Sequence, residues 1–469
     1  MKTNVLFILS DSLRSDFLGC YGDEKTKSPN IDLLAKRGVS FSKAYAENPL
    51  TIPSRTAMVS SCYTFTHRPW MPLLDTDFHI AEIMKKNGYV TAAFSNSPFD
   101  IKSNMNRGFD TFKEYTQKNS PVSPKHYDFP DLKRVDPSLQ EWMESYTAHI
   151  ERRLHALERG DLPSDAPELL TREAIRWLKK DSGKKPFFLW LDYFDPHEPW
   201  SPPPPYDDMY DPGYEGRLFP RPRYICDYLT ESELNHIRAL YRGCITQVDD
   251  QIEPVMETLD ELGLTDDTLI IFTSDHAEPL GDHGTIRKNG VPMWEELTRI
   301  SFILKGPSIP QGKTMGCLIE NTDVAPTILG LLGIEPVLPA ELWEGRDLTP
   351  LIRGELDQVR DSAYMGYFTR KPYTSWVEGP LRFNTRAAIR TDRFKLIINN
   401  SRIPGFPVTN ELYNIEEDPF ERCNLINEEK EVAEHLQDDL LRFVDISFYS
   451  NYCNRLLRGK AYYYRVDKY

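Results

Sequence analysis

The chain of 469 residues contains only seven cysteines, and none of them stands in a Cys-x-x-Cys pair. Their odd number and wide scatter argue against a disulfide framework or a zinc knuckle, and favour reduced thiols. Long apolar runs are also missing: no stretch approaches the roughly 18 apolar residues that a membrane-spanning helix needs. The first apolar run, residues 5–9, is too short and too soon followed by charge for a signal peptide. We therefore expect a soluble, cytoplasmic protein that does not attach to a membrane.

Positive charge is in short supply. The chain has 56 basic and 71 acidic residues, which gives a formal net charge of −15. A field of this sign repels phosphate backbones, so nucleic-acid binding is excluded as the main role. An anionic substrate must instead be met by a local cationic pocket. The hydrophobic content of 40% is ample for a buried core.

Short β-branched and aromatic runs alternate along the chain with amphipathic stretches. This alternation predicts repeated βα units, and thus an α/β fold with a mostly parallel sheet covered by helices. Strands are expected at 5–9, 89–94, 187–194, 268–273 and 300–304, and helices at 31–36, 78–86, 169–180, 231–262 and 322–332. Two irregular insertions, near 117–167 and 196–222, are interpreted as substrate walls or as spacers.

The pattern changes after about residue 355. Hairpin-like pieces at 386–390, 394–398 and 411–413 precede a final helix at 428–444. We expect a catalytic α/β domain over 1–355 and a smaller α+β domain over 356–469. The basic, Tyr-rich tail either docks on its own domain or makes a contact in a homo-oligomer.

Polar residues follow three of the predicted strands directly. Asp11 follows the first strand, His197 closely follows the strand at 187–194, and Asp275 and His276 follow the strand at 268–273. Ligands of open parallel sheets bind beyond the carboxyl ends of the strands, so two carboxylates and an imidazole could converge on a divalent cation. Taken singly, each signal is weak, because such an Asp is often a helix cap and a lone His is often structural.

Thr51 is a candidate nucleophile. It lies two residues before Pro53, which suits the first turn of a helix, so free backbone amides near Thr51 would face an anion. Arg55 adds a planar donor fork suited to phosphate or sulfate oxygens. From this segment alone, a helix cap and a surface arginine are an equally good interpretation.

Taken together, the motifs resemble the sulfatase branch of the alkaline phosphatase superfamily. The stretches that carry the resemblance are DSLRSD at 11–16, LGCYG at 18–22, SPNID at 28–32, PSR at 53–55, RGFD at 107–110, DPH at 195–197, SDH at 274–276, GDHG at 281–284, RTDRFKL at 390–396 and ELY at 411–413. The resemblance implies an alkaline-phosphatase-like sandwich, with a large mostly parallel sheet flanked by helices and a smaller C-terminal α+β domain with a short antiparallel sheet.

The resemblance also implies one divalent metal ion that activates a side-chain nucleophile. The implied metal ligands are Asp11, Thr51, Asp275 and His276. The implied catalytic and substrate-binding residues are Thr51 as nucleophile, Arg55 to hold the nucleophile and the anion, and His197 and Lys288 to bind the transferred group or protonate the leaving oxygen. Glu278 and His283 could orient His276 or Lys288, or could form a capped turn.

Thr51 departs from the family pattern. Sulfatases proper carry a Cys or Ser there that is oxidised to formylglycine, and threonine cannot yield that aldehyde. A threonyl intermediate must be opened by water at the central atom, so we expect a hydrolase of phosphate mono- or diesters, or of phosphonate esters, that acts through phospho-Thr51. The alternatives are a sulfuric ester hydrolase that acts without formylglycine and a degenerate, anion-binding member of the family.

Two further departures bear on the metal. Many sulfatases have a second Asp where this chain has Ser12, and often an Asn where it has His276. Loss of a carboxylate and gain of an imidazole move the site from an oxygen-rich calcium cage toward Mn²⁺ or Zn²⁺, with Ca²⁺ as the remaining option.

Overall fold

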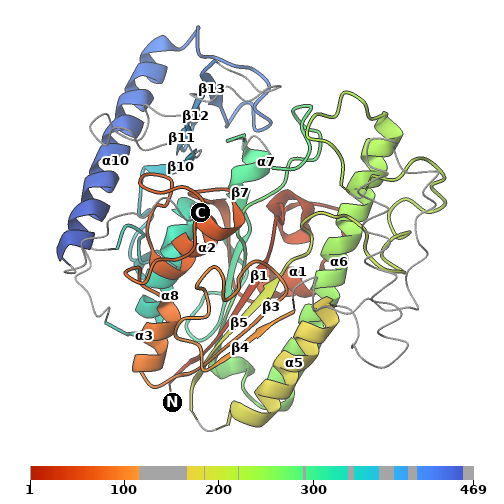
Figure 1. Cartoon of the computed structure of the whole chain (residues 1–469), viewed down its shortest axis with the longest axis vertical. Helices are drawn as coiled ribbons and strands as arrows, with labels where there is room; N and C mark the ends of the chain where they lie inside the picture. The colour runs from red at the N-terminus through yellow and green to blue at the C-terminus, as the bar shows by residue number, and fades with distance from the viewer. Residues whose placement is uncertain are drawn as a thin grey trace.

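The computed structural model describes residues 2–115, 166–183, 185–219, 221–288, 292–335, 343–368, 385–399 and 409–457. Within these ranges the chain forms a large sheet flanked by helices and a small sheet covered by one long helix (Figure 1). The predicted insertion at 117–167 lies outside the described residues except for its last two positions.

The large sheet has nine strands in the order β4-β3-β5-β1-β6-β8-β2-β7, with β9 paired to β2. The strands are β1 (Asn4–Ser10), β2 (Val39–Tyr45), β3 (Val90–Ser95), β4 (Thr111–Glu114), β5 (Phe187–Tyr193), β6 (Thr268–Ser274), β7 (Arg299–Ile300), β8 (Phe302–Lys305) and β9 (Lys313–Glu320). From β4 to β6 all neighbours are parallel, whereas β8 is antiparallel to both β6 and β2. The prediction of a mostly parallel sheet is confirmed.

The described part of the chain contains both long and short helices. They are α1 (Pro29–Lys36), α2 (Thr51–Ser60), α3 (Ile80–Lys86), α5 (Ala166–Asp181), α6 (Glu231–Glu261), α7 (Glu295–Thr298), α8 (Val324–Leu332), α9 (Thr349–Ile352) and α10 (Lys430–Leu457), with 3-10 turns η1 (Ser15–Phe17), η2 (Gly19–Tyr21), η5 (Thr265–Asp267) and η6 (Asn321–Asp323). No helix among the described residues has the length and apolar content needed to cross a membrane.

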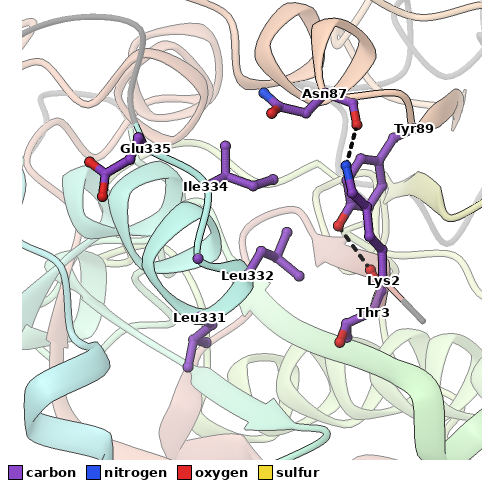
Figure 2. A pocket seen from close by; sticks show the side chains of 9 residues that line it. Lys2, Thr3, Asn87, Tyr89, Leu331, Leu332, Ile334 and Glu335 are labelled. Atoms are coloured by element: carbon purple, nitrogen blue, oxygen red, sulfur yellow. Dashed lines mark hydrogen bonds between the residues drawn. The ribbon is translucent and has the colours of Figure 1, made fainter.

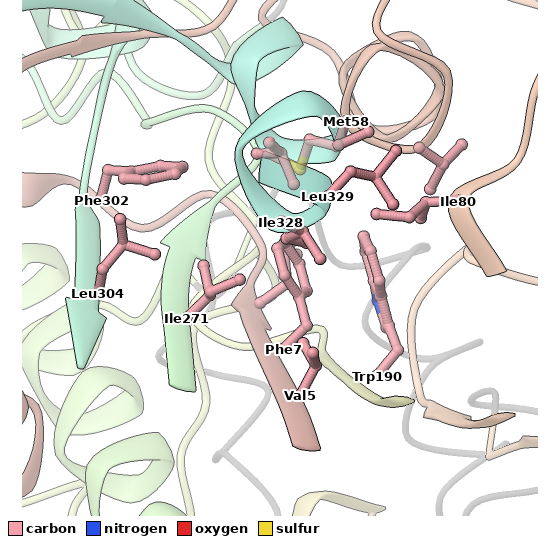
Figure 3. Packing of buried hydrophobic residues seen from close by; sticks show 14 of the residues in the cluster. Val5, Phe7, Met58, Ile80, Trp190, Ile271, Phe302, Leu304, Ile328 and Leu329 are labelled. Atoms are coloured by element: carbon pink, nitrogen blue, oxygen red, sulfur yellow. The ribbon is translucent and has the colours of Figure 1, made fainter. Parts of the chain in front are cut away.

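Strand β1 is buried on both faces, and its alternate residues feed two separate cores. Val5 and Phe7 face the core formed with α2, α3 and α8, where Phe7 stacks on Trp190 at 3.9 Å between ring centroids (Figure 3). Leu6 and Ile8 face the second core, formed with α1, α5 and α6. This double cover fixes the strand rigidly and so positions the residues that follow it.

The small sheet consists of β10 (Ser362–Phe368), β11 (Thr385–Thr391), β12 (Phe394–Asn399) and β13 (Glu411–Asn414), all antiparallel. Helix α10 packs on it through Leu436, Leu440 and Val444 (Figure 1). The predicted C-terminal antiparallel sheet is therefore confirmed. The domain boundary near residue 355 and the role of the tail stay predictions, since residues 458–469 lie outside the described ranges.

The strand expected at 300–304 is divided in the structure into β7 and β8. At the break, the backbone amide of Ser301 donates to the side chain of Ser274 at 3.2 Å. The apolar run alone carries no sign of this side-chain hydrogen bond, and therefore predicts one continuous strand.

Candidate active site

The carboxyl ends of β1, β5 and β6 lie side by side, because Ser10 is in register with both Tyr193 and Ser274. Asp11 and Asp275 therefore leave the sheet at the same level. Asp11, Asp275 and His276 are fully buried, and each offers a ligand atom within 4.8 Å of the others. The structure thus brings together three of the four residues predicted to bind metal.

Thr51 is the fourth. It begins α2 after Leu50, and its side-chain Oγ1 lies 3.5 Å from Nε2 of His276. The residue is only 2% exposed. Pro53 occupies the first turn of the helix, where its missing N–H costs no hydrogen bond. The structure therefore has the helix start that the sequence predicts, with the hydroxyl beside the cluster.

His276 is held in one orientation by its own backbone neighbour. Its Nδ1 lies 2.9 Å from the carbonyl oxygen of Ala277, so Nδ1 is the donor and Nε2 keeps its lone pair in the neutral ring. Burial and the nearby Lys288 ammonium lower the pKa of His276 well below its usual value. A neutral imidazole whose second nitrogen donates to a carbonyl is the usual state of a metal-binding histidine.

Arg55 lies one turn further along α2 and is completely buried. Its guanidinium makes a fork with Asp192, with distances of 2.7 Å from Nη2 to Oδ1 and 3.1 Å from Nε to Oδ2. It also pairs with Asp275 and lies 3.1 Å from Oδ2 of Asp11. Its only contact with the backbone of Thr51 is a long one, 3.4 Å to the carbonyl oxygen. The structure therefore places the Arg55 guanidinium in contact with all three aspartates.

The charges of this group fit a divalent cation. In their ionised form, the buried Asp11, Asp192 and Asp275 carry three negative charges, and Arg55 and the neighbouring Lys288 carry one positive charge each, which leaves a sum of −1. Buried charge without compensation is costly. Oδ2 of Asp11 lies 3.1 Å from Nη2 of Arg55 but accepts no well-aligned hydrogen bond from the described part of the chain. Two carboxylates, an imidazole and a hydroxyl form a donor set suited to a divalent metal ion.

Lys288 reaches the same site from the loop after β6. Its Nζ lies 3.2 Å from Oγ of Ser12, which in turn donates to Asp11 at 2.9 Å. Nζ also lies 3.5 Å from the buried carboxylate of Glu278. Burial alone would lower the pKa of Lys288, but the charges of Glu278 and Glu198 outweigh it and raise the pKa. Lys288 is therefore a charged ammonium, able to donate a proton.

His197, in contrast to the charged Lys288, is a neutral side chain. Its ring stacks on Phe194 at 4.2 Å between centroids, and its Nδ1 lies 2.7 Å from the carbonyl oxygen of Glu198. Burial and the charge of Lys288 lower the pKa of His197. The ring is therefore neutral with its hydrogen on Nδ1, and Nε2 is free to accept a proton.

Some features of this site are not predicted by the sequence. Asp192 lies within the apolar run of β5, and a lone carboxylate among buried neighbours was the available signal. Ser12 and Arg287 have φ of 63° and 66°, a left-handed conformation that neither residue type predicts. His283 packs between Glu296 and Trp294 instead of beside His276 or Lys288.

Three aromatic residues of the proline-rich insertion at 196–222 contact the body of the protein. Trp200 is fully buried and donates from Nε1 to the carbonyl oxygen of Pro196 at 2.9 Å. Tyr206 and Tyr210 form hydrogen bonds to Asp250 and Thr246 of α6. These three aromatic residues are therefore engaged in packing the insertion onto the body of the protein.

A separate pocket of about 410 Å³ lies elsewhere on the molecule. Lys2 and Tyr89 contribute hydrogen bonds to its wall, opposite Leu332 and Ile334 at the end of α8 (Figure 2). Lys2 lies nine residues before Asp11, at the other end of β1, so at about 3.3 Å per residue the two sites are roughly 30 Å apart. None of the predicted site residues lines this pocket, and we do not assign the reaction to it.

Comparison with known proteins identifies the family models and relatives that the chain resembles. The family model described as Sulfatase matches residues 3–334, and the model described as N-sulphoglucosamine sulphohydrolase, C-terminal, matches residues 281–445. The chain is 26% identical over 496 residues to an arylsulfatase of Clostridium perfringens, covering 94% of each chain. It is 27% identical over 493 residues to the multifunctional alkaline phosphatase superfamily protein PehA of Trinickia caryophylli, covering 90% of this chain and 91% of PehA. The phosphonate monoester hydrolase of Agrobacterium radiobacter has a similar fold, with a TM-score of 0.69, 24% identity and coverage of 95% and 96%.

Proposed function

We propose that this chain, which belongs to the sulfatase family, hydrolyses phosphate or phosphonate esters and uses Thr51 as the nucleophile. Membership of the family makes it an ester hydrolase. The choice of phosphorus as the central atom and of Thr51 as the attacking group is our proposal. The observation that carries it is the threonine at the start of α2, with its hydroxyl 3.5 Å from Nε2 of His276.

Threonine limits the chemistry that can follow the attack. Its Cβ carries a methyl group, so oxidation would give a ketone and never the aldehyde on which formylglycine chemistry depends. An ester formed on Thr51 Oγ1 cannot be released by collapse of a hydrate. It must be opened by water at the central atom, as a phosphothreonine ester can be.

Asp11, Thr51, Asp275 and His276 would hold a divalent metal ion, since their donor atoms and the net charge of the buried group fit one. When bound, the ion would neutralise the ester oxygens and lower the pKa of the Thr51 hydroxyl. One imidazole beside two carboxylates favours Mn²⁺ or Zn²⁺, with Ca²⁺ as the remaining option.

In the first step, the bond from Thr51 Oγ1 to phosphorus forms and the bond to the leaving oxygen breaks. Lys288 gives the leaving oxygen a proton, and the proton lost by the Thr51 hydroxyl replaces it. Proton donation of this kind contributes about 10² to 10⁴ in rate. In the second step, water attacks phosphorus, the bond to Oγ1 breaks, and one proton of the water returns to Oγ1 through Nε2 of His197. The protonation states of Lys288 and His197 support this division of roles.

Hydrolysis of sulfate esters without formylglycine is the second candidate, and the similarity to an arylsulfatase favours it. A degenerate member that only binds anions is the third. In each case we propose a small anionic ester or anion as the partner, and a cytoplasmic location.

The test is a panel of substrates. Protein loaded with Mn²⁺, Zn²⁺ or Ca²⁺ is assayed on aryl phosphate monoesters, phosphodiesters, phosphonates and sulfates. Thr51→Ala is the negative control and Thr51→Ser is the conservative variant. We expect turnover of phosphorus esters that Thr51→Ala abolishes. Turnover of sulfate alone would refute the choice of phosphorus, and turnover of no ester would leave the anion-binding alternative.

A further inference from the structure

Glu198 is a buried carboxylate that connects the two groups that move protons in the proposed reaction. It follows His197 just beyond β5, and its side chain is 4% exposed. Oε2 lies 3.1 Å from Nδ1 of His197 and 3.9 Å from Nζ of Lys288. The carboxylate therefore lies close to both residues, and Lys288 in turn contacts Ser12 beside Asp11.

The other oxygen of Glu198 is fixed by Arg287. Nε of Arg287 donates to Oε1 at 2.7 Å, and its Nη1 donates to the carbonyl oxygen of Pro222 at 3.1 Å. The guanidinium also lies over the ring of Tyr224, 4.9 Å from its centroid. The carboxylate of Glu198 is thus anchored to the proline-rich insertion and cannot turn freely.

The backbone at Arg287 adds a second constraint. Its φ of 66° is left-handed, a conformation that is unfavourable for a residue with a Cβ. Such a conformation persists only where the surroundings determine it. The contact of Arg287 with Glu198 is one such constraint, and the bend directly precedes Lys288. The position of Lys288 therefore depends on Glu198 both through direct attraction and through the backbone that leads to it.

We infer that Glu198 is a positioning residue, which holds Lys288 and His197 at the place where the ester group reacts. This inference rests on the proposed function. The alternative to this positioning role is a purely structural one, in which Glu198 compensates the charge of Arg287 and has no effect on the position of Lys288 or His197.

Binding of inorganic phosphate to the Mn²⁺-loaded protein separates these two roles without any need for turnover. Removing a carboxylate makes the site more positive, so charge alone predicts that Glu198→Gln binds phosphate more tightly. Loss of positioning predicts the opposite, because Lys288 no longer faces the anion. Loss of residues that orient a binding group typically weakens binding by about 10- to 100-fold, and we expect a change of that size in calorimetric titration.

Two variants control this measurement. Asp16→Asn makes the same change of charge at a carboxylate that is 45% exposed and pairs with Arg14, and should alter phosphate binding by less than about twofold. Glu198→Asp keeps the buried charge, and so the fold, but withdraws the carboxylate by one methylene. It should bind phosphate with an affinity between those of wild type and Glu198→Gln.

Phosphate binding by Glu198→Gln that is equal to or tighter than in wild type would overturn the inference. Should Glu198→Gln not fold, unchanged binding by Glu198→Asp would overturn it equally. In an active enzyme, the loss of kcat in Glu198→Gln should be larger for phenyl than for 4-nitrophenyl esters, since the poorer leaving group depends more on the proton from Lys288. An equal loss for both would indicate a structural role. A wild type that binds phosphate but hydrolyses no ester would refute the proposed function alone.

Discussion

Replacing Arg55 with methionine should destabilise the metal-free protein more than the loss of an exposed ion pair does. Methionine retains an unbranched apolar side chain but removes the guanidinium that pairs with Asp11, Asp192 and Asp275. Three carboxylates would then lie in a fully buried place, with the Lys288 ammonium, which reaches Asp11 through Ser12, left as the nearby positive charge. The structure therefore predicts both a loss of stability and a stronger dependence on a bound cation.

The size of the effect follows from burial. Removing one partner of a buried ion pair costs about 3–5 kcal/mol, because the other charge is left uncompensated. Arg442 offers a control of the same residue type, since its side chain is 70% exposed and lies 3.6 Å from Asp439. Exposed pairs of this kind contribute about 0–1 kcal/mol. The free energy of unfolding should therefore fall several kcal/mol further in Arg55→Met than in Arg442→Met.

Urea unfolding followed by tryptophan fluorescence measures the difference, first without metal and then with Mn²⁺. A ligand at 100 times its Kd stabilises the folded state by about 2.7 kcal/mol. Arg55→Met should gain more from Mn²⁺ than wild type does, because the guanidinium no longer competes for Asp11 and Asp275. Equal stability of the two metal-free variants, or an equal gain from Mn²⁺ in Arg55→Met and wild type, would refute the reasoning.

Three further predictions concern the metal, a positioning carboxylate and pH. Chelation of the metal should abolish hydrolysis and lower the unfolding midpoint, and Mn²⁺ should restore both; activity that survives removal of the metal, verified by elemental analysis, would contradict this. Asp192→Asn should weaken Mn²⁺ binding by about 10- to 100-fold in calorimetry, since Arg55 loses its fork and moves toward the remaining aspartates; unchanged affinity would argue against it. His283 has its pKa raised from 6.5 to about 9: burial opposes the shift, and the hydrogen bond and charge of Glu296 outweigh it. Its stabilising contribution is fully present below pH 6.5 and is lost as the pH rises through about 9, by at most about 3 kcal/mol, and His283→Gln should flatten that part of the stability profile.

The parts of the site that sequence predicts are those governed by local rules. Asp11, Asp275 and His276 directly follow apolar runs, and adjacent parallel strands must deliver such residues to one edge of the sheet. Thr51 is placed at a helix start by Pro53, which needs no hydrogen-bond partner there. For the same reason the hairpins of the small sheet are predictable from short alternating runs.

The parts that sequence does not predict depend on distant contacts. Strand β2 mixes apolar residues with Ser40, Ser42 and Lys43, and its pairing with β8 and β9 joins segments far apart in the chain. The role of Asp192 becomes clear from its hydrogen bond with Arg55, which lies on a different element, helix α2. Likewise, the sequence shows Glu198 as a charged residue in a proline-rich loop. Its contacts with Arg287 and Lys288, which lie far away in the sequence, are visible only in the structure.

Identification of the covalent intermediate tests the central claim, that Thr51 attacks phosphorus, most directly. The Mn²⁺-loaded protein is mixed with an aryl ester labelled with ³²P, quenched in acid during the first turnovers, and digested for peptide mapping. We predict label on the peptide that begins α2, recovered as phosphothreonine at Thr51, and no label in Thr51→Ala. Steady hydrolysis of the ester with no label on Thr51 would contradict the account.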